Sequence, residues 1–497
     1  MTTAYAALEF RFARIGTLRE ALAVLHWDHS SMMPAGGSQA RAAQISTLEV
    51  LSHEMLTDRA VAGLLDQASE EDGLSPWQRA NLAEMRRDWV AASALPPALV
   101  EARVKAEIDC EMAWREARPA DDYEAVKPAL GRLLDLVREV AQAKAALTGT
   151  SPIDALIDEY EPGARSAEID RLFDGLGGFL PGLVGAILEH QAARPAPIIP
   201  DGPFPQAAQH ALAHELMGVV GFDFEHGRLD TSLHPFCGGT PDDVRITTRY
   251  NEADFRRAIL GVLHESGHAL YEQGLPAAWR RQPVGRARGL GLHESQSLLI
   301  EMQVCRSRAF IEFAAPRFRA AFGGSGPAWD AENLYRLNIQ AARSLIRVDA
   351  DEVTYPAHVI LRYRLEKALI GGDLSLDDLP GAWREGMASL VGVAPETDAD
   401  GCLQDIHWYC GLWGYFPTYT LGALTAAQFF AAAGESEPGL LKAIGEGDFG
   451  PLLRWLRSNV HGRGSSVSSA EIVRDATGRP LDIGVFRDHL HRRYLAD

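Results

Sequence analysis

Apolar side chains recur at intervals of three and four residues along most of the chain, which is the period of an amphipathic α-helix. This pattern predicts helices over residues 5–26, 38–66, 76–94, 97–117 and 122–148. Helical periodicity resumes after residue 291, with loops expected near 322–328, 371–380 and 392–403. No repeat of fixed length occurs, so a solenoid is not expected. The pattern therefore predicts an all-α, mainly helical protein.

One segment departs from this pattern, between residues 243 and 250. Its apolar and β-branched residues alternate with polar neighbours, which indicates a β-strand. Asn251 is a suitable N-cap, and apolar residues then follow with helical period until Gly274. We therefore expect a strand followed directly by a helix over residues 252–273.

A proline-rich stretch, residues 194–205, divides the helical pattern. We take it as the connection between an N-terminal helical half, roughly residues 1–200, and a catalytic half, roughly 201–497. The composition is similar on both sides, so we expect one catalytic unit over residues 1–497 and no separate domain.

The predicted helix 252–273 carries His264-Glu-Ser-Gly-His268. Residues four apart lie on one helix face, with roughly 6 Å between their Cβ atoms. Two imidazoles at this spacing can bind one tetrahedral zinc ion. Glu265, turned about 100° from His264, could then act as general base toward the water that the metal activates.

The third metal ligand is less obvious from the sequence. Glu272 lies four residues past His268 on the same helix and is the local alternative. The glycines between residues 285 and 291 allow the chain to turn back, so that Glu294 would begin an antiparallel helix facing the first. We favour Glu294 and expect His293 to be a neighbouring or substrate contact. His210 and His214 share the helical spacing but have no glutamate between them, so solvated helix residues are the default interpretation.

Composition and charge indicate which partners and which cellular compartment to expect. The formal charge is −19, with no basic run, so a nucleic acid partner is not expected. Five scattered cysteines without a C-x-x-C motif favour a reducing cytoplasm over a disulfide framework. The N-terminus does not resemble a signal peptide. The most apolar window, residues 175–188, is short and broken by glycines and a proline, so no membrane span is expected.

Six short motifs occur in order along the chain. They are His234-Pro-Phe236, Asp243-Val-Arg-Ile-Thr247, His264–His268, His293-Glu-Ser295, Ile346-Arg-Val-Asp-Ala-Asp351 and Gly401-Cys-Leu-Gln-Asp-Ile-His-Trp408. An N-terminal W-D-x-x-x-M-M-P pattern, Trp27 to Pro34, precedes them. In this ordered set the chain resembles the carboxypeptidase Taq family of metallocarboxypeptidases over nearly its whole length.

This resemblance implies that His264, His268 and Glu294 bind one divalent metal ion, zinc or cobalt, with Glu265 as general base. It implies an almost wholly helical fold of the neurolysin-like metallopeptidase architecture, with a small antiparallel sheet beside a deep active-site groove. The usual assembly would be a homodimer. The implied activity is removal of C-terminal residues from short peptides, with broad preference and poor tolerance of proline.

A carboxypeptidase must recognise a free carboxylate, which arginine binds through paired, charge-assisted hydrogen bonds. Arg347 and Arg245 are the candidates, and we favour Arg347. The alternative for either is an internal ion pair, with Asp351 or Asp243 as partner.

Other motif residues complete the expected substrate-binding set. The segment Asp243–Thr247 is expected to close the end of the groove, and His234 and Gln404 are expected to contact substrate. Gln404, or Asp405 beside it, could instead orient neighbouring groups.

His407 and Tyr419 could stabilise the oxyanion of the transition state as preorganised donors. Tyr409 and Tyr415 are alternatives for that role, and core packing is the default interpretation of this aromatic segment. In other glutamate-zincins an aspartate four residues past the ligand often supports the first histidine, but Leu298 stands there. The sequence does not indicate which residue replaces it.

Two other functions remain open from the residues alone. One is an oligoendopeptidase or dipeptidyl peptidase of similar helical fold. The other, from a different class, is a non-catalytic helical scaffold that binds metal.

Overall fold

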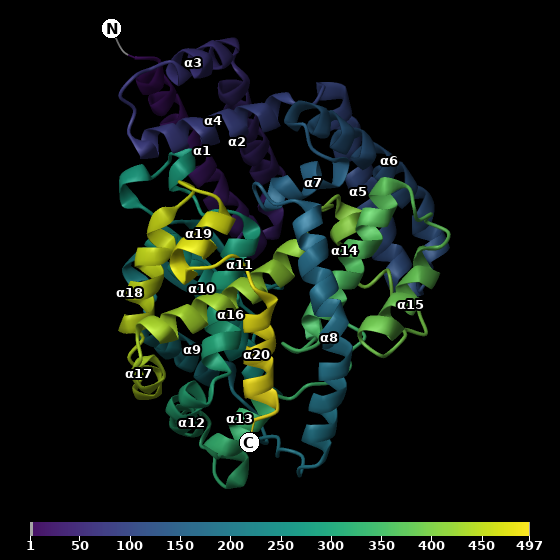
Figure 1. Cartoon of the computed structure of the whole chain (residues 1–497), viewed down its shortest axis with the longest axis vertical. Coiled ribbons are helices and arrows are strands. Elements are labelled where there is room, and N and C mark those ends of the chain that lie inside the picture. The colour runs from purple at the N-terminus through teal and green to yellow at the C-terminus, as the bar shows by residue number, and fades with distance from the viewer. Residues whose placement is uncertain (1–2, 497) are drawn as a thin grey trace.

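The computed structural model describes residues 3–496, which form α-helices, short helical turns and a three-stranded sheet (Figure 1). The helices are α1 (Ala4–Ser31), α2 (Ser38–Thr57), α3 (Arg59–Ser69), α4 (Pro76–Ser93), α5 (Pro97–Ala120), α6 (Tyr123–Thr148), α7 (Pro152–Tyr160), α8 (Ser166–Ala192), α9 (Gln206–Val220), α10 (Phe255–Gly274), α11 (Leu290–Leu298), α12 (Arg308–Phe322), α13 (Ala331–Asn338), α14 (Tyr355–Gly371), α15 (Leu379–Leu390), α16 (Pro417–Ser436), α17 (Leu440–Glu446), α18 (Gly450–Asn459), α19 (Ser469–Thr477) and α20 (Ile483–Tyr494). The prediction of a mainly helical protein is confirmed.

Short helical turns punctuate the connections. They are η1 (Ala35–Gly37), η2 (Phe224–His226), η3 (Ala277–Trp279), η4 (Pro283–Gly285), η5 (Leu299–Cys305), η6 (Pro327–Trp329), η7 (Arg347–Asp349), η8 (His407–Cys410) and η9 (His461–Arg463). All are 3₁₀ turns except η5, which is π-helical and directly continues α11.

Local sequence explains where the helices begin. The predicted helix 38–66 is two helices, because the Asp58 side chain accepts a hydrogen bond from the Ala60 amide and begins α3. The predicted cap at Asn251 is wrong by three residues. Asp254 accepts from the Arg256 amide and begins α10, whereas Asn251 accepts from the Ala253 amide in the preceding turn. In both cases, an aspartate side chain that accepts a hydrogen bond from a backbone amide sets the residue at which the helix begins.

The sheet contains β1 (Gly227–Thr231), β2 (Phe236–Thr240) and β3 (Asp243–Thr248), in the order β1-β3-β2. The strands β2 and β3 are antiparallel, but β1 runs parallel to β3. The sheet is therefore mixed, and the prediction of an antiparallel sheet is wrong for one pair. The tight turn between Thr240 and Asp243 forces the antiparallel pair. The turn after Thr231 reverses the chain once more, which leaves β1 parallel to the central strand.

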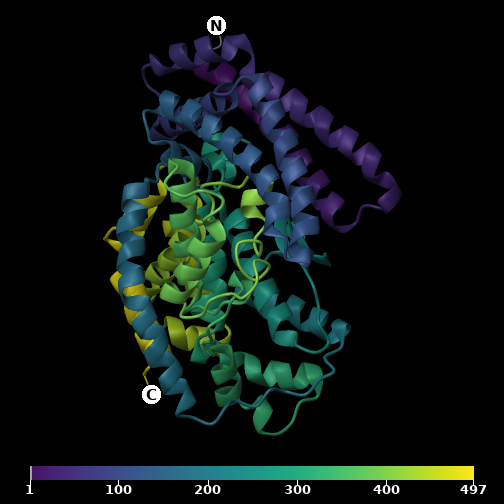
Figure 2. The same cartoon turned by 90° about the vertical axis from the view of Figure 1, so that its right-hand side faces the viewer.

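The apolar core is divided unequally along the chain. Helices α1–α4 enclose a small cluster around Leu8, Phe12 and Leu65 at one end of the molecule, and the α1–α2 hairpin projects from the body (Figure 2). A second, larger core runs from Cys110 to Tyr494 and includes residues on both sides of the proline-rich stretch. The predicted halves meeting near residue 200 stay a prediction, and apolar packing is continuous across that point.

Helix α8 is long and apolar enough to cross a membrane by length and composition alone. The expectation that its proline and glycines break it is wrong, because the helix continues through Pro181 over 27 residues. Its residues Ile169, Phe173 and Leu180 are buried in the larger core. A core helix passes the same test of length and composition, so this helix alone is weak evidence for a membrane.

Candidate metal centre

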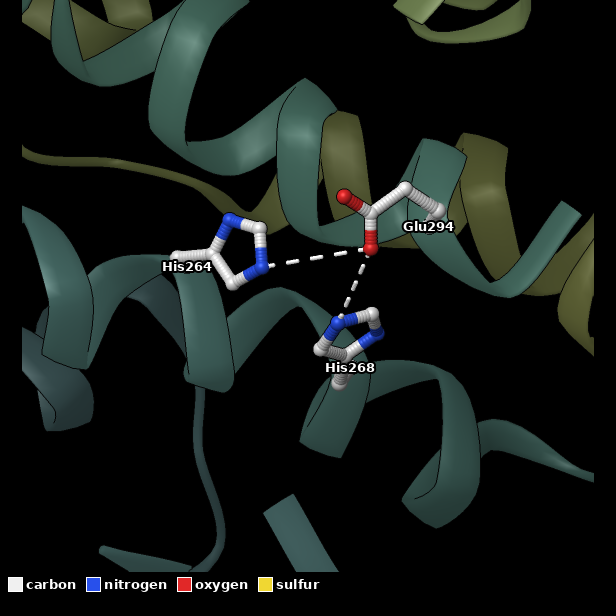
Figure 3. Close-up of side chains that lie close together, drawn as sticks. All are labelled: His264, His268 and Glu294. Atoms are coloured by element: carbon white, nitrogen blue, oxygen red, sulfur yellow. Dashed lines mark ion pairs between the residues drawn. The ribbon is translucent and has the colours of Figure 1, made fainter. Parts of the chain in front are cut away.

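Two neighbouring helices bring the predicted metal ligands together (Figure 3). Helix α10 carries His264 and His268 one turn apart, and α11 carries Glu294. The Glu294 Oε2 atom lies 3.5 Å from His268 Nε2 and 4.0 Å from His264 Nε2. Among residues 3–496 these three form the group able to hold a metal ion, with ligand atoms within 4.8 Å of one another. The preference for Glu294 as third ligand agrees with this geometry.

Glycines allow the backbones around this cluster to approach. A Cβ atom at Gly267, between the histidines in α10, would lie 2.4 Å from the Gln296 carbonyl oxygen of α11. A Cβ atom at Gly422 of α16 would lie 2.8 Å from Glu294 Cγ. Both distances are too short for a side chain without displacement of the neighbour. Helix α11 is therefore held between α10 and α16 at close range, with Glu294 directed toward the two histidines.

The donor set fits a divalent cation. Two imidazole nitrogens and one carboxylate oxygen are the ligand types of catalytic zinc sites such as His₂Glu. Burial alone would lower the pKa of His264, but the hydrogen bond to Glu301 and the charges of Glu294 and Glu265 raise it to about 10. Three buried carboxylates thus surround one imidazole, and a divalent cation would balance their charge.

Glu265 is 9% exposed and lies on the same helix between the two ligands. Burial, together with the nearby Glu294 charge, raises the pKa of Glu265 to about 7. A carboxyl group whose pKa lies near 7 can both take up a proton and return it at neutral pH.

The other histidine candidates lie outside the ligand set. His293 Nε2 is 2.9 Å from Glu272 Oε1, so the local alternative ligand Glu272 is engaged elsewhere. His210 and His214 are exposed on α9, and His214 stacks on Phe224 with ring centroids 3.8 Å apart. The default interpretation of that pair as surface residues agrees with these positions.

Comparison with known proteins places this site in a family. A model described as carboxypeptidase Taq (M32) metallopeptidase matches residues 7–494. Thermostable carboxypeptidase 1 of Thermus thermophilus is 42% identical over 487 residues, covering 95% of each chain. The structure of metallocarboxypeptidase 1 from Trypanosoma cruzi has a TM-score of 0.97 and 40% identity, covering 99% of each chain. The M32 carboxypeptidase from Deinococcus radiodurans has a TM-score of 0.93 and 36% identity, covering 99% of this chain and 98% of that one.

The chain belongs to the carboxypeptidase Taq (M32) family of metallopeptidases. The predictions of family, of a mainly helical fold and of a metal-dependent carboxypeptidase are confirmed. The neurolysin-like comparison, the identity of the metal and the homodimer stay predictions.

The two histidines that are predicted ligands in this M32 protein differ in the partners of their Nδ1 atoms. His268 Nδ1 lies 3.1 Å from the His293 carbonyl oxygen and 2.6 Å from His293 Nδ1. His264 Nδ1 lies 3.0 Å from Glu301 Oε2. The sequence did not single out Glu301, because it lies seven residues past Glu294 in the π-helical turn η5. The only signal available was a glutamate two turns downstream of the ligand.

Arg347 lies in a buried cluster with a second arginine that the sequence did not indicate. Arg347 Nη2 is 2.8 Å from Asp405 Oδ1, and Arg362 Nε is 2.5 Å from Asp405 Oδ2. The internal partner of Arg347 is therefore Asp405 and not Asp351. Gln404 Oε1 accepts from the Arg347 amide at 2.9 Å and from Arg362 Nη2 at 2.7 Å. Gln404 thus orients the arginines in this structure.

His407 and Tyr419 lie beside this cluster. His407 Nε2 is 3.2 Å from the Tyr419 hydroxyl, and the Arg347 guanidinium lies 4.9 Å from the Tyr419 ring centroid. Burial lowers the pKa of His407 to about 4, so its imidazole is neutral near pH 7. Burial raises the pKa of Tyr419, and the Glu294 charge adds to the effect. Of the alternatives, Tyr415 lies 5.2 Å from Tyr419 between ring centroids.

Tyr409, the other alternative for the oxyanion role, is fully buried in this structure. Its hydroxyl donates to the Cys402 carbonyl oxygen at 3.0 Å. This position agrees with the default interpretation of core packing.

The remaining predicted substrate contacts lie in or beside the sheet. Arg245 pairs with Asp243 at 2.6 Å and lies 4.7 Å above the Trp27 ring of α1. The hydroxyl of buried Thr247 bonds the Phe236 amide at 3.1 Å. His234 is exposed in the turn between β1 and β2. The Arg245–Trp27 contact connects the sheet to α1, and the expectation that the segment closes a groove stays a prediction.

Substitution of Gly267 by alanine tests the close approach of α10 and α11. Its Cβ atom would push the Gln296 backbone away and move Glu294 from the histidines, so we expect zinc affinity to fall by at least about tenfold. Gly261→Ala on the same helix is the matched control, because a Cβ atom there meets no atom within 4 Å. Competition with a chromogenic chelator measures both affinities. Equal zinc affinity in the two variants would show that the close approach is not required.

Proposed function

We propose that this M32 peptidase removes residues one at a time from the carboxyl end of short peptides, with one zinc ion held by His264, His268 and Glu294. Cobalt is the alternative metal. When bound, such an ion supplies Lewis-acid polarisation of a carbonyl group and lowers the pKa of water to about 7. The chain's own residues supply the proton transfer, the position of the peptide and the recognition of its end.

Glu265 is the proposed general base and acid. It takes a proton from the water that attacks the last peptide carbonyl, and it then gives that proton to the leaving amine as the C–N bond breaks. Its carboxylate is buried beside the ligands, and its pKa near 7 suits transfer in both directions.

The charge of the arginine cluster is the observation that best supports recognition of a chain end. Arg347 and Arg362 share one carboxylate, Asp405, so the three buried groups carry a net charge of +1. A buried positive charge without an anion is costly, and a peptide carboxylate would balance it. Arg347 Nη1 does not face Asp405, and it makes only a long hydrogen bond, 3.5 Å, to the uncharged Tyr355 hydroxyl. This nitrogen can therefore bind the peptide carboxylate.

His407 and Tyr419 are proposed to stabilise the oxyanion. The Tyr419 phenol stays protonated because burial raises its pKa, and so it can donate a hydrogen bond. The neutral His407 ring holds that phenol in place at 3.2 Å. Donors fixed before the reaction stabilise developing charge without reorganisation.

Finer properties follow from the family resemblance and from composition. We propose broad preference for the terminal residue with poor cleavage at proline, a homodimeric assembly and a cytoplasmic location. The free thiols support the last point, since five cysteines form no disulfide among the described residues.

Replacement of Glu265 by glutamine tests the proton transfer. Glutamine keeps the size of the side chain but cannot accept the proton, so we expect kcat to fall by about 100-fold or more. The metal content should stay equal to that of the parent protein, because Glu265 is not a ligand. Turnover of a tripeptide and elemental analysis of the same samples measure the two quantities. Retained turnover would remove Glu265 from the mechanism.

Peptides with a free or an amidated carboxyl end test the role of Arg347. We expect the parent enzyme to favour the free peptide by at least about 100-fold in kcat/KM, and Arg347→Met to abolish most of that preference. Arg245→Met is the matched control, since Arg245 is paired with Asp243 in the sheet. Efficient cleavage of amidated peptides by the parent enzyme would indicate an endopeptidase. Loss of the preference only in Arg245→Met would assign the carboxylate to that residue.

A further inference from the structure

A π-helical turn follows the ligand helix and changes which residue faces the metal centre. Segment η5 continues α11 directly. Leu298, four residues past Glu294, is apolar and 2% exposed in the core. Glu301, in the π turn, instead reaches His264, with 3.0 Å between Oε2 and Nδ1. Such turns within helices are frequent at functional sites, and here the turn supplies a carboxylate that α11 lacks.

Glu301 is held as a charged group by a second residue. Its Oε1 atom accepts from Arg306 Nη2 at 2.7 Å, and both side chains are largely buried. Each carboxylate oxygen of Glu301 thus has its own partner, the Arg306 guanidinium at Oε1 and the His264 ring at Oε2. Pairing with a guanidinium favours the charged form of a carboxylate.

The turn itself is fixed by the C-terminal helix α20. Arg493 Nη2 donates to the Gln303 carbonyl oxygen at 2.8 Å, and Nη1 donates to that of Met302. Arg493 is anchored in turn by Glu352, with 2.9 Å between Nη1 and Oε2. Two carbonyls of η5 are thus held by a helix that is distant in sequence, which limits the movement of Glu301.

From this geometry we propose that Glu301, supported by Arg306, is a positioning residue that orients His264 for the metal ion. A carboxylate beside Nδ1 holds the proton on that nitrogen and leaves Nε2, which lies 4.0 Å from Glu294 Oε2, as the nitrogen that would bind the metal ion. The charge also raises the basicity of the ring as a ligand. His268 Nδ1 lies 3.1 Å from the His293 carbonyl oxygen and 2.6 Å from His293 Nδ1. Its partners at that nitrogen are therefore uncharged or basic atoms, whereas His264 has a carboxylate, and the two imidazoles are supported unequally. This inference rests on the proposed metal site.

Zinc affinity of Glu301→Gln tests the proposal without reference to turnover. We expect the dissociation constant, measured by chelator competition, to rise by about 10- to 100-fold. Asp223→Asn is the matched control. Asp223 is also a carboxylate within hydrogen-bond distance of a histidine, at 2.8 Å from His226 Nδ1, but that histidine is exposed and outside the ligand set. Its dissociation constant should stay within about twofold of the parent value.

A double variant separates positioning from folding. Glu301→Gln leaves Arg306 without its anionic partner, so we expect the metal-free form of the single variant to lose thermal stability. Glu301→Gln with Arg306→Gln removes both charges. We expect the double variant to recover the thermal midpoint of the metal-free protein while its zinc affinity stays weak.

The outcomes distinguish this inference from the proposed function. Parent-like zinc affinity in Glu301→Gln, or recovery of affinity in the double variant, would overturn the positioning role while leaving the metal site intact. Failure of the parent protein to bind zinc, or equal binding by His264→Ala, would instead overturn the metal site on which the inference rests.

Discussion

The close approach of α10 and α11 at Gly267 is the constraint on which the site depends. Two histidines one helical turn apart present two nitrogens, but a third ligand must come from another element. Only a residue without a side chain permits the Gln296 carbonyl to lie against α10 at that point. Gly422 of α16 supports α11 from the other side in the same way. The position of Glu294 is therefore set by backbone contact and requires no long flexible side chain.

Charge divides the surroundings of the ligands into two parts. Around His264, the carboxylates of Glu265, Glu294 and Glu301 form a negative region suited to a cation. Beside it, Arg347 and Arg362 exceed the single charge of Asp405 and form a positive region suited to an anion. Tyrosine and histidine side chains that carry no charge near pH 7 lie next to the positive region. A peptide end, with a carbonyl to be attacked and a carboxylate to be held, presents the complementary pattern.

Local patterns predicted much of this molecule, since helical period and the His264–His268 spacing depend on neighbouring residues alone. The first helix and the position of α10 follow from such patterns. The parallel pairing of β1 with β3 was missed because alternation identifies a strand without identifying its partner. Glu301 was missed because a π turn changes the helical register on which counting relies. Arg362 was missed because its buried position depends on Asp405, which lies 43 residues away in the sequence. The residues next to Arg362 do not indicate that pairing.

The central claim is that one divalent ion joins α10 to α11 through His264, His268 and Glu294. Anomalous diffraction from zinc-soaked crystals, recorded above and below the zinc absorption edge, tests it most directly. The account predicts one strong peak in contact with both Nε2 atoms and the Glu294 carboxylate, and loss of that peak in Glu294→Ala. A peak that persists in that variant, or one that lies beside His210 and His214, would contradict it.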